Sequence, residues 1–330
     1  MKHTKMWLMA GAITATAALA LTGCSTGDAP AGGDGETKTD ITVGFSVYDM
    51  QYEFFQEMEA GTKAAVEANG WDYVLHDEKS DENEMVTGAQ ALLDQGVDVL
   101  IISPFKPDAL GPIIAKAQEL GVPVIVDDIG GGGTPYDAIV VSDNKDGGVQ
   151  AADFIDAQVK ELGLASKKVV SITCEPSAVY AAQRNIGFVE QIESLGYEVV
   201  TELSGNSKAE EAYTIMKDAL AKDPDIAGVF ACNDPMAVAA ANAITDAGKN
   251  PTKDIVTVGY NGDGEALTAI DADGLSATVA QDPKGMGTLT VELAKKLLDK
   301  EDIEFGNADE REVYQPVTLI TKANVADFLK

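Results

Sequence analysis

The feature that most constrains this sequence is a regular alternation of short apolar segments with amphipathic helical segments, beginning at Ile41. The pattern occurs twice, with expected strands at residues 41–46, 71–76, 97–102, 122–126 and 138–141, and again at 168–173, 197–201, 226–231, 256–260 and 276–280. Between the strands, apolar residues recur at helical spacing. A helix–Gly–aromatic–strand phrase at residues 69–74 returns at 195–200, which indicates two similar halves.

Alternating strands and helices form mostly parallel sheets with right-handed crossovers. We therefore expect an α/β protein with two similar doubly wound parallel-sheet lobes, joined by a three-stranded hinge. The predicted first lobe comprises residues 41–142 and 282–312, and the second comprises 143–281 and 313–330. The expected crossovers lie at 141–143, 281–283 and 312–316. Ligands bind beyond the carboxyl ends of such strands, so a ligand cleft is expected between the lobes.

The first 40 residues are expected to lie outside the fold. Lys2, His3 and Lys5 precede a short apolar stretch that ends at Cys24, within a sequence that resembles a bacterial lipobox. This predicts a signal peptide at residues 1–23, lipidation of Cys24 and a flexible tether at 24–40. An uncleaved anchor helix is the alternative. In both cases the folded part would lie outside the cytoplasmic membrane.

The charge of the chain limits its partners. The formal net charge is −30, which repels nucleic acid and anionic lipid. A neutral or cationic ligand fits this field better than a phosphate-rich one. The same charge also has a simpler interpretation as a soluble, self-repelling surface.

Groups that carry out catalysis or bind metals are scarce. His76 is the one histidine after residue 24, and it lies in an expected strand, so neither a multi-histidine metal site nor a catalytic triad is expected. The four glycines at 130–133 are not followed by a helical pattern, which argues against a phosphate-binding loop. We predict a binding protein without catalytic residues, metal or cofactor, rather than an enzyme.

Seven short phrases occur in order at strand ends or helix starts, and together they resemble the ribose-binding type of periplasmic binding protein from about Ile41 to Ile320. They lie at residues 54–55, 122–128, 142–144, 184–188, 229–234, 258–262 and 277–281. The resemblance implies a monosaccharide or sugar alcohol as ligand and a membrane-embedded ABC permease as partner. We expect a monomer that is lipid-anchored to a bacterial membrane.

The resemblance also implies roles for side chains of the first lobe. Tyr52, Phe54 and Phe55 would stack on the sugar face, where C–H groups favour an aromatic surface, and Tyr48 is a further candidate. Asp128 would accept hydrogen bonds from two hydroxyl groups. Asp127 is a competing candidate for this role. The family often has Arg after this Asp, but Ile129 stands here.

In the second lobe, Arg184 is the strongest candidate for a ligand-binding residue. The chain has two arginines, and the planar guanidinium can donate to two ligand oxygens in a way that lysine cannot reproduce. Tyr180 lies four residues earlier, on the same helical face. The alternative for Arg184 is an ordinary surface ion pair.

The resemblance further implies three amide ligands, Asn233, Asn261 and Gln281. Each could instead serve as a helix cap or turn residue. Asn261 stands where the ribose-like pattern has Asp, which points to a different sugar, polyol or related ligand. Ser207 stands where some relatives have a stacking aromatic residue, so one wall of the site would be thinner.

Cys174 and Cys232 end the first and third strands expected in the second lobe. In a sheet of order 2-1-3-4-5 these strands are neighbours, so a disulfide is conceivable in an oxidising compartment. Adjacent parallel strands rarely offer suitable geometry, and we therefore expect two buried thiols.

Three other functions share parts of this pattern. A ligand-sensing subunit for a chemoreceptor would have the same features. A nucleoside or a furanosyl signal could replace the sugar, because Ile129 and Asn261 depart from the pattern. A repressor core has the same fold but needs a DNA-binding segment where this chain has a secretion signal.

Overall fold

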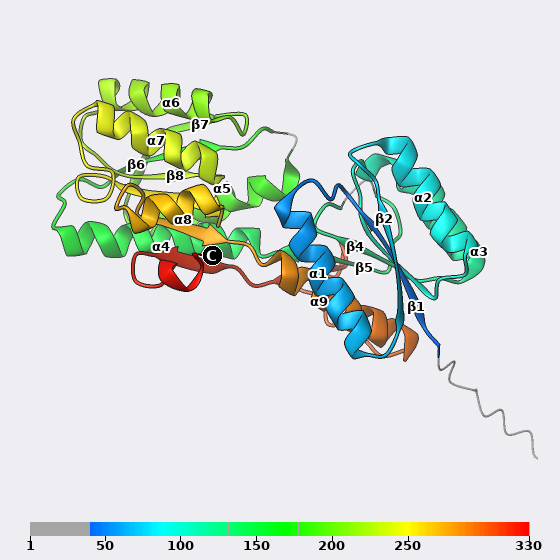
Figure 1. Ribbon diagram of the computed structural model, residues 1–330. Coiled ribbons are helices and arrows are strands. Elements are labelled where there is room, and N and C mark those ends of the chain that lie inside the picture. Colours follow the sequence, from blue (N-terminus) through cyan, green and yellow to red (C-terminus); the bar gives the residue numbers. More distant parts are fainter. Residues whose placement is uncertain (1–39, 131–132, 177, 330) are drawn as a thin grey trace, which may run out of the picture. The chain divides into compact units, whose positions relative to one another are not determined.

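The computed structural model describes residues 40–130, 133–176 and 178–329, and the strands of this part form two six-stranded sheets (Figure 1). The first sheet has the order β11 (Glu312–Gln315), β5 (Ala138–Ser142), β4 (Val124–Asp127), β3 (Val99–Ser103), β1 (Thr42–Val47) and β2 (Asp72–Asp77). The second has the order β12 (Thr318–Thr321), β10 (Ala277–Ala280), β9 (Val256–Asn261), β8 (Ile226–Ala231), β6 (Lys168–Thr173) and β7 (Glu198–Ser204).

The strand order confirms the predicted fold class. Both sheets place their strands in the doubly wound order, and the described pairs are parallel apart from β10 with β12. The predicted signal peptide, Cys24 and the tether up to Thr39 lie outside the described residues.

Helices cover both faces of each sheet. In the first lobe, α1 (Glu53–Ala68) and α9 (Pro283–Leu298) pack on one face, and α2 (Glu82–Asp94) and α3 (Gly111–Leu120) pack on the other. In the second lobe, α4 (Asn144–Leu162) and α5 (Val179–Ser194) lie opposite α6 (Ala209–Lys222), α7 (Asp234–Asp246) and α8 (Gly264–Asp271). Two 3₁₀ turns, Pro107–Ala109 and Val325–Asp327, complete the described elements.

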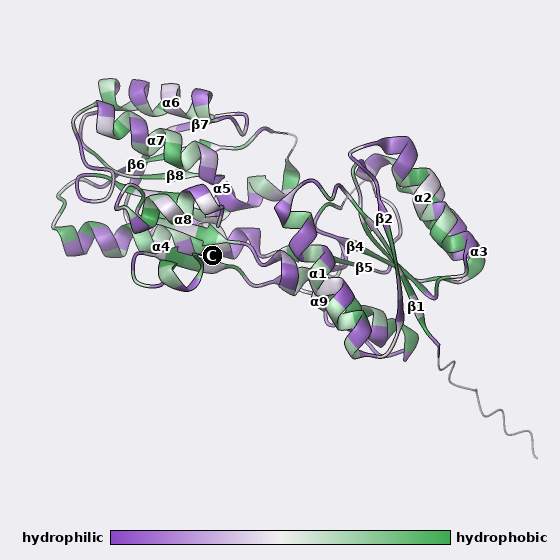
Figure 2. Ribbon diagram, in the orientation of Figure 1, coloured by the Kyte–Doolittle hydropathy of each residue, from purple (hydrophilic) through white to green (hydrophobic). Residues whose placement is uncertain are grey.

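The strands are apolar on both sides because each sheet is covered twice. Along β3, Val99 and Ile101 contribute to the core under α1 and α9, whereas Leu100 and Ile102 contribute to the core under α2 and α3. Such alternation follows from the two-residue period of a strand. Figure 2 shows the strands as largely hydrophobic and the helices as mixed, with one apolar and one polar side.

Two helix pairs approach closely at glycine. A Cβ on Gly61 of α1 would lie 2.1 Å from the Lys284 carbonyl oxygen of α9, and one on Gly148 of α4 would lie 2.1 Å from the Arg184 carbonyl oxygen of α5. A side chain at either position would therefore push the helices apart. The second contact fixes the height of Arg184 above the sheet.

Within the described ranges, the chain passes between the two sheets three times. The passages follow Ser142, Ala280 and Gln315, where β5, β10 and β11 end. The residues from Val313 to Gln315 pair with β5 in the first sheet, so the last change of sheet comes a few residues after the predicted boundary at Glu312.

The expectation of two free thiols was wrong, because Cys174 and Cys232 form a disulfide. Their Cα atoms are 5.7 Å apart, within the usual range for a bridge. The last paired residues of β6 and β8 are Ile172 and Ala231, so both cysteines lie just beyond the ladder. The Cys232 amide donates to the Ile172 carbonyl oxygen (3.0 Å), which keeps the two strand ends side by side.

Candidate ligand-binding site

Arg184 is buried at the carboxyl ends of the second-lobe strands. Its Nε donates to Asn144 Oδ1 (2.8 Å), and its Nη1 donates to the Cys232 carbonyl oxygen (2.8 Å) and to Asn261 Oδ1 (3.3 Å). Its Nη2 donates to Gln281 Oε1 (3.3 Å). These four hydrogen bonds hold the guanidinium in one orientation.

The face of the guanidinium is covered as well. Its central carbon lies 3.8 Å from the centre of the Tyr260 ring, a cation–π contact. Removal from water lowers the pKa of Arg184, while Tyr260 and the carboxylates of Asp128 and Asp234 act in the opposite direction. Arg184 is therefore a fixed, desolvated cation rather than a surface ion-pair partner.

The network around Arg184 reaches the crossovers between the sheets. Gln281 Nε2 donates to Ser142 Oγ (2.9 Å), and Asn144 Nδ2 donates to the Ser142 carbonyl oxygen (3.0 Å). Gln281 follows β10 and Ser142 ends β5, so both lie where the chain leaves one lobe for the other. A change in the relative position of the lobes would act directly on these bonds.

Asp128 of the first lobe interacts electrostatically with Arg184 of the second. Desolvation raises the pKa of Asp128 to about 6, and Arg184 acts to lower it. The backbone of Asp128 has a positive φ of 65°, a conformation that Asp tolerates better than most residues. This turn directs Asp128 away from the sheet immediately after β4.

Asp127 differs from its neighbour because it is fully buried in β4. Among the described residues, nothing donates a hydrogen bond to either carboxylate oxygen of Asp127. Burial raises the pKa of Asp127 well above its usual range, and the charge of Asp128 adds to this effect. Of the two candidates, Asp128 is the one that interacts with Arg184.

Tyr180 brings the second lobe against the first. It lies in the first turn of α5 and packs on the first-lobe core below α2 and α3. A Cβ placed on Gly130 would lie 3.2 Å from the Tyr180 hydroxyl oxygen. Burial raises the pKa of Tyr180. Asp128, Tyr180 and Arg184 therefore converge on one region.

The amides divide into two groups. Asn261 and Gln281 bind Arg184, whereas Asn233 caps α7 by accepting a hydrogen bond from the Met236 amide (3.0 Å). The capping alternative for Asn233 therefore holds for its carbonyl oxygen. Asn261 has a positive φ of 122°, which is strained for a residue with a side chain.

Asp234 holds the turn that carries Asn261. Its Oδ2 accepts from the amides of Gly262 (2.8 Å) and Asp263 (2.7 Å), and its Oδ1 accepts from Thr278 Oγ1 (2.7 Å). Burial raises the pKa of Asp234 to about 7, and these donors counteract the rise. The hydrogen bonds of Asp234 thus stabilise the strained backbone at Asn261.

The aromatic residues of the first lobe form a separate group. The ring centres of Tyr48 and Phe55 are 4.8 Å apart and stacked, and Phe54 meets Phe55 edge-on at 5.2 Å. Tyr52 approaches Tyr48 at 6.3 Å and is half exposed (49%) at the start of α1. Phe55 is buried and is the common neighbour of the other three rings, Tyr48, Tyr52 and Phe54.

Comparison with known proteins identifies the family. Residues 43–302 match the family described as "Periplasmic binding protein domain".

The chain belongs to the periplasmic binding protein family.

Two curated relatives and one solved structure illustrate the likeness. The ribose import binding protein of Bacillus subtilis is 33% identical over 285 residues, covering 86% of this chain and 88% of that protein. The xylitol-binding protein of Mycolicibacterium smegmatis is 28% identical over 324 residues, covering 96% and 86%. A periplasmic ribose ABC transporter protein of Conexibacter woesei has the same fold, with a TM-score of 0.76, 24% identity and coverage of 88% and 95%.

Membership of this family establishes the class of the protein and its location outside the cytoplasm. This periplasmic binding protein is an extracytoplasmic solute-binding protein, and its relatives bind solutes for transport rather than convert them. No helix among the described residues is long and apolar enough to cross a membrane. Across the same residues, no group of three or more His, Cys, Asp or Glu side chains could hold a metal ion.

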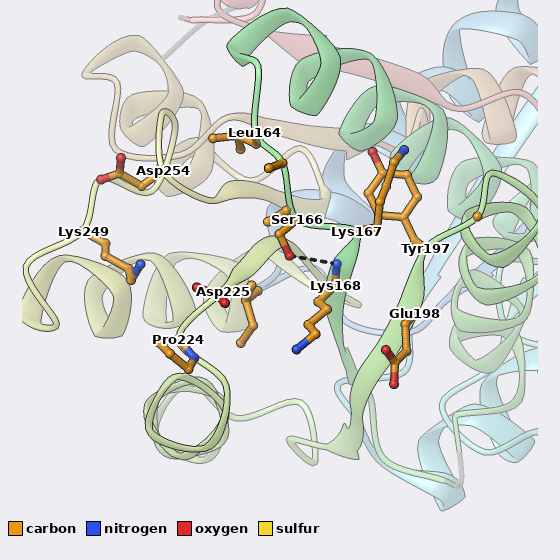
Figure 3. A pocket seen from close by; sticks show the side chains of 14 residues that line it. Leu164, Ser166, Lys167, Lys168, Tyr197, Glu198, Pro224, Asp225, Lys249 and Asp254 are labelled. Carbon is orange, nitrogen blue, oxygen red and sulfur yellow. Dashed lines mark hydrogen bonds between the residues drawn. The ribbon is translucent and has the colours of Figure 1, made fainter.

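A hollow of about 770 Å³ lies at the other edge of the second sheet, where β6, β7 and β8 begin (Figure 3). Lys167, Lys168, Tyr197 and Lys249 are among its lining residues, and none of the predicted site residues is. Lys167 lies over the Tyr197 ring at 3.8 Å, and Lys168 pairs with Asp223 at 2.6 Å. These lysines are engaged by the protein itself, so this periplasmic binding protein has its candidate site at the opposite edge.

Three residues of the candidate site were not predicted from the sequence. Asn144 lay in the phrase at 142–144 without a predicted role; in the structure Asp143 caps α4, and Asn144 binds Arg184. Tyr260 and Asp234 lay inside phrases that carried the resemblance, although no role followed from it. Their position in the sequence was the available signal, because each is adjacent to a predicted ligand-binding residue at the end of a strand.

Proposed function

We propose that this periplasmic binding protein binds a monosaccharide or sugar alcohol and delivers it to an ABC permease. The observation that carries the proposal is the convergence of Asp128 from one lobe with Arg184 from the other. A ligand held between these groups would bridge the lobes and favour their closure.

The chemistry of the site supports a ligand rich in hydroxyl groups. The Asp128 carboxylate accepts hydrogen bonds, and the guanidinium of Arg184 and the side-chain amide of Asn233 donate them. Hydroxyl groups both donate and accept, so they can satisfy all three. The half-exposed ring of Tyr52 offers an aromatic surface suited to the C–H face of a sugar, and the buried Phe55 packs behind it. The ribose and xylitol named for the two relatives belong to the same chemical class.

Location and assembly extend the proposal. Residues 1–23 would be removed as a signal peptide, Cys24 would carry the lipid, and residues 24–40 would tether the lobes to the membrane surface. The protein would act as a monomer. A net charge of −30 supports a ligand that is neutral or cationic rather than anionic.

A thermal-shift screen with pentoses, hexoses, polyols, nucleosides and amino acids tests the proposal. A ligand present at a thousand times its Kd stabilises the folded state by about 4 kcal/mol. We expect hydroxylated compounds to raise the midpoint of unfolding and amino acids to leave it unchanged. A response to amino acids alone would exclude the proposed ligand class.

Substitution of the two arginines tests the site. Arg184→Lys keeps the charge but loses the bonds to Asn261 and Gln281, so most of the ligand-induced shift should disappear. Arg311→Lys is the matched control, because Arg311 donates to the carbonyl oxygens of Tyr136 and Asp137 at the end of the first lobe. An unchanged shift in Arg184→Lys would remove Arg184 from the site.

A further inference from the structure

The Cys174–Cys232 disulfide lies directly beside the candidate site. It joins the segments that leave the carboxyl ends of β6 and β8, and its two residues are separated by 58 positions in the sequence. Cys232 is fully buried, and Cys174 is 9% exposed. Both belong to the apolar core of the second lobe.

Each half of the bridge connects to a part of the site. The Cys232 carbonyl oxygen accepts the 2.8 Å hydrogen bond from Arg184 Nη1, and the next residue is Asn233. Cys174 begins the segment that leads into α5, where Tyr180 and Arg184 lie. The bridge therefore ties together the acceptor that orients Arg184 and the chain segment that carries Arg184.

We propose that this disulfide positions Arg184 and Asn233 for the ligand, so that reduction weakens ligand binding while both lobes stay folded. The inference rests on the proposed function. An arginine side chain loses much rotamer freedom when it is fixed, and a site that is already ordered binds more tightly because less ordering remains to be done. Reduction removes the covalent restraint on the segment after Cys174 and on the Cys232 carbonyl group. Each binding event would then have to fix the Arg184 side chain in its orientation.

The chemical step is a two-electron reduction. A dithiol reductant attacks the Cys174 sulfur, which is the more accessible of the two, through a mixed disulfide. The S–S bond breaks, two thiols form with two protons from the reductant, and the reductant leaves as its own disulfide. Oxidants of the extracytoplasmic space reverse the step.

The first arm of the test measures affinity. Wild-type protein and the Cys174→Ala/Cys232→Ala variant are titrated calorimetrically with a hydroxylated ligand found in the screen, at a temperature well below unfolding. Loss of one well-placed charge-assisted hydrogen bond weakens binding about tenfold. If the variant does not fold, wild-type protein reduced with a phosphine and verified by mass replaces it. An affinity within twofold of the oxidised protein would overturn the proposal.

A second arm observes Arg184 without a ligand. The chain has two arginines, so its proton–nitrogen spectrum holds two arginine Nε–H signals, which Arg311→Lys assigns. Reduction should shift or broaden the Arg184 signal and leave that of Arg311 in place. An unmoved Arg184 signal in fully reduced protein would show that the bridge is structural only.

A double-mutant cycle connects the two arms. Loss of the bridge should have little further effect on affinity in Arg184→Lys, but its full effect in Arg311→Lys, because Arg311 bonds to Tyr136 and Asp137 and lies outside the candidate site. Equal effects in both backgrounds would contradict action through Arg184. Failure of the oxidised wild-type protein to bind any hydroxylated compound would instead count against the proposed function, and the spectrum of Arg184 would still test the positioning.

Discussion

At the scale of single residues, Asp127 and Asp128 are adjacent in the sequence but differ in environment. The Asp128 carboxylate is a candidate ligand-binding group, whereas the Asp127 carboxylate is buried in the core. The ordinary strand conformation of β4 turns Asp127 into the first-lobe core, and the positive φ of Asp128 turns the next side chain toward Arg184. The same functional group thus meets two environments. One is compensated by a cation, and the other has no partner among the described residues.

The uncompensated acid predicts that Asp127→Leu stabilises the protein at neutral pH. Because the folded-state pKa of Asp127 is raised, the folded state loses stability as the pH rises from about 4, where an unfolded Asp ionises, to that raised pKa. We expect a gain of about 1–3 kcal/mol at pH 8 and a smaller gain at pH 4. Thermal unfolding between pH 4 and 8 measures both.

The control for this prediction is Asp108→Asn. Asp108 is exposed in the turn after β3, so the substitution should leave the pH profile unchanged. Asp127→Leu would contradict the interpretation if it destabilised the protein throughout the pH range, since that result would mean that the carboxyl group makes favourable contacts in the core.

The proximity of three candidate site residues was predictable from sequence, because chain position alone fixes their place in the fold. Arg184, Asn261 and Gln281 stand at strand ends or in the helix that follows one, and the fold brings such positions together. Asn144 could not be found in this way. Capping and binding residues at a helix start have the same composition, and only the backbone geometry decides that Asp143 caps and Asn144 does not.

At the scale of elements, the position of α5 depends on its contact with α4. Gly148→Ala would place a Cβ 2.1 Å from the Arg184 carbonyl oxygen and 2.6 Å from the Phe188 amide, so the α5 backbone must move. We expect a loss of about 1–3 kcal/mol in stability, because overpacked cores commonly lose this much. Ligand affinity should fall as well, since α5 carries Tyr180 and Arg184. Thermal unfolding and calorimetric titration separate the two effects.

Gly228→Ala is the matched control within the same lobe. Its Cβ would lie 2.8 Å from the Ile155 side chain, which can adjust without moving a backbone. The control should lose some stability and keep its affinity. If both substitutions weakened binding equally, packing of the second lobe in general, and not the position of α5, would control the site.

Elements were predicted well because strands and helices have a local signal in apolar periodicity. The neighbouring positions of β6 and β8 followed from the doubly wound order and are present in the structure. The bridge between their ends was not predicted. Its formation depends on how the two cysteine side chains are oriented at the strand ends, and this orientation has no sequence pattern of its own.

At the scale of the whole molecule, the three passages between the sheets decide how the lobes can move. Gln281 bonds to Ser142 beside two of these passages and to Arg184 in the site. Gln281, which helps to orient the candidate ligand-binding residue Arg184, is therefore also attached to the segments that connect the lobes. This arrangement provides a short mechanical connection between an occupied site and the relative position of the lobes.

Ligand binding should therefore change the distance between the lobes, and paired spin labels can measure this change. Labels at Glu119→Cys in α3 and Lys217→Cys in α6 report on the two lobes, and both positions are exposed. The native bridge protects Cys174 and Cys232 from labelling, and Cys24→Ser removes the remaining thiol. A saturating ligand should move the distance distribution to a single new position.

A pair within the second lobe, Glu161→Cys and Lys217→Cys, should keep its distance, and the interlobe pair should not respond in Arg184→Lys. If the interlobe distance stayed constant at a ligand concentration that stabilises the protein, binding would occur without closure, and the connection through Gln281 would have no role in transport.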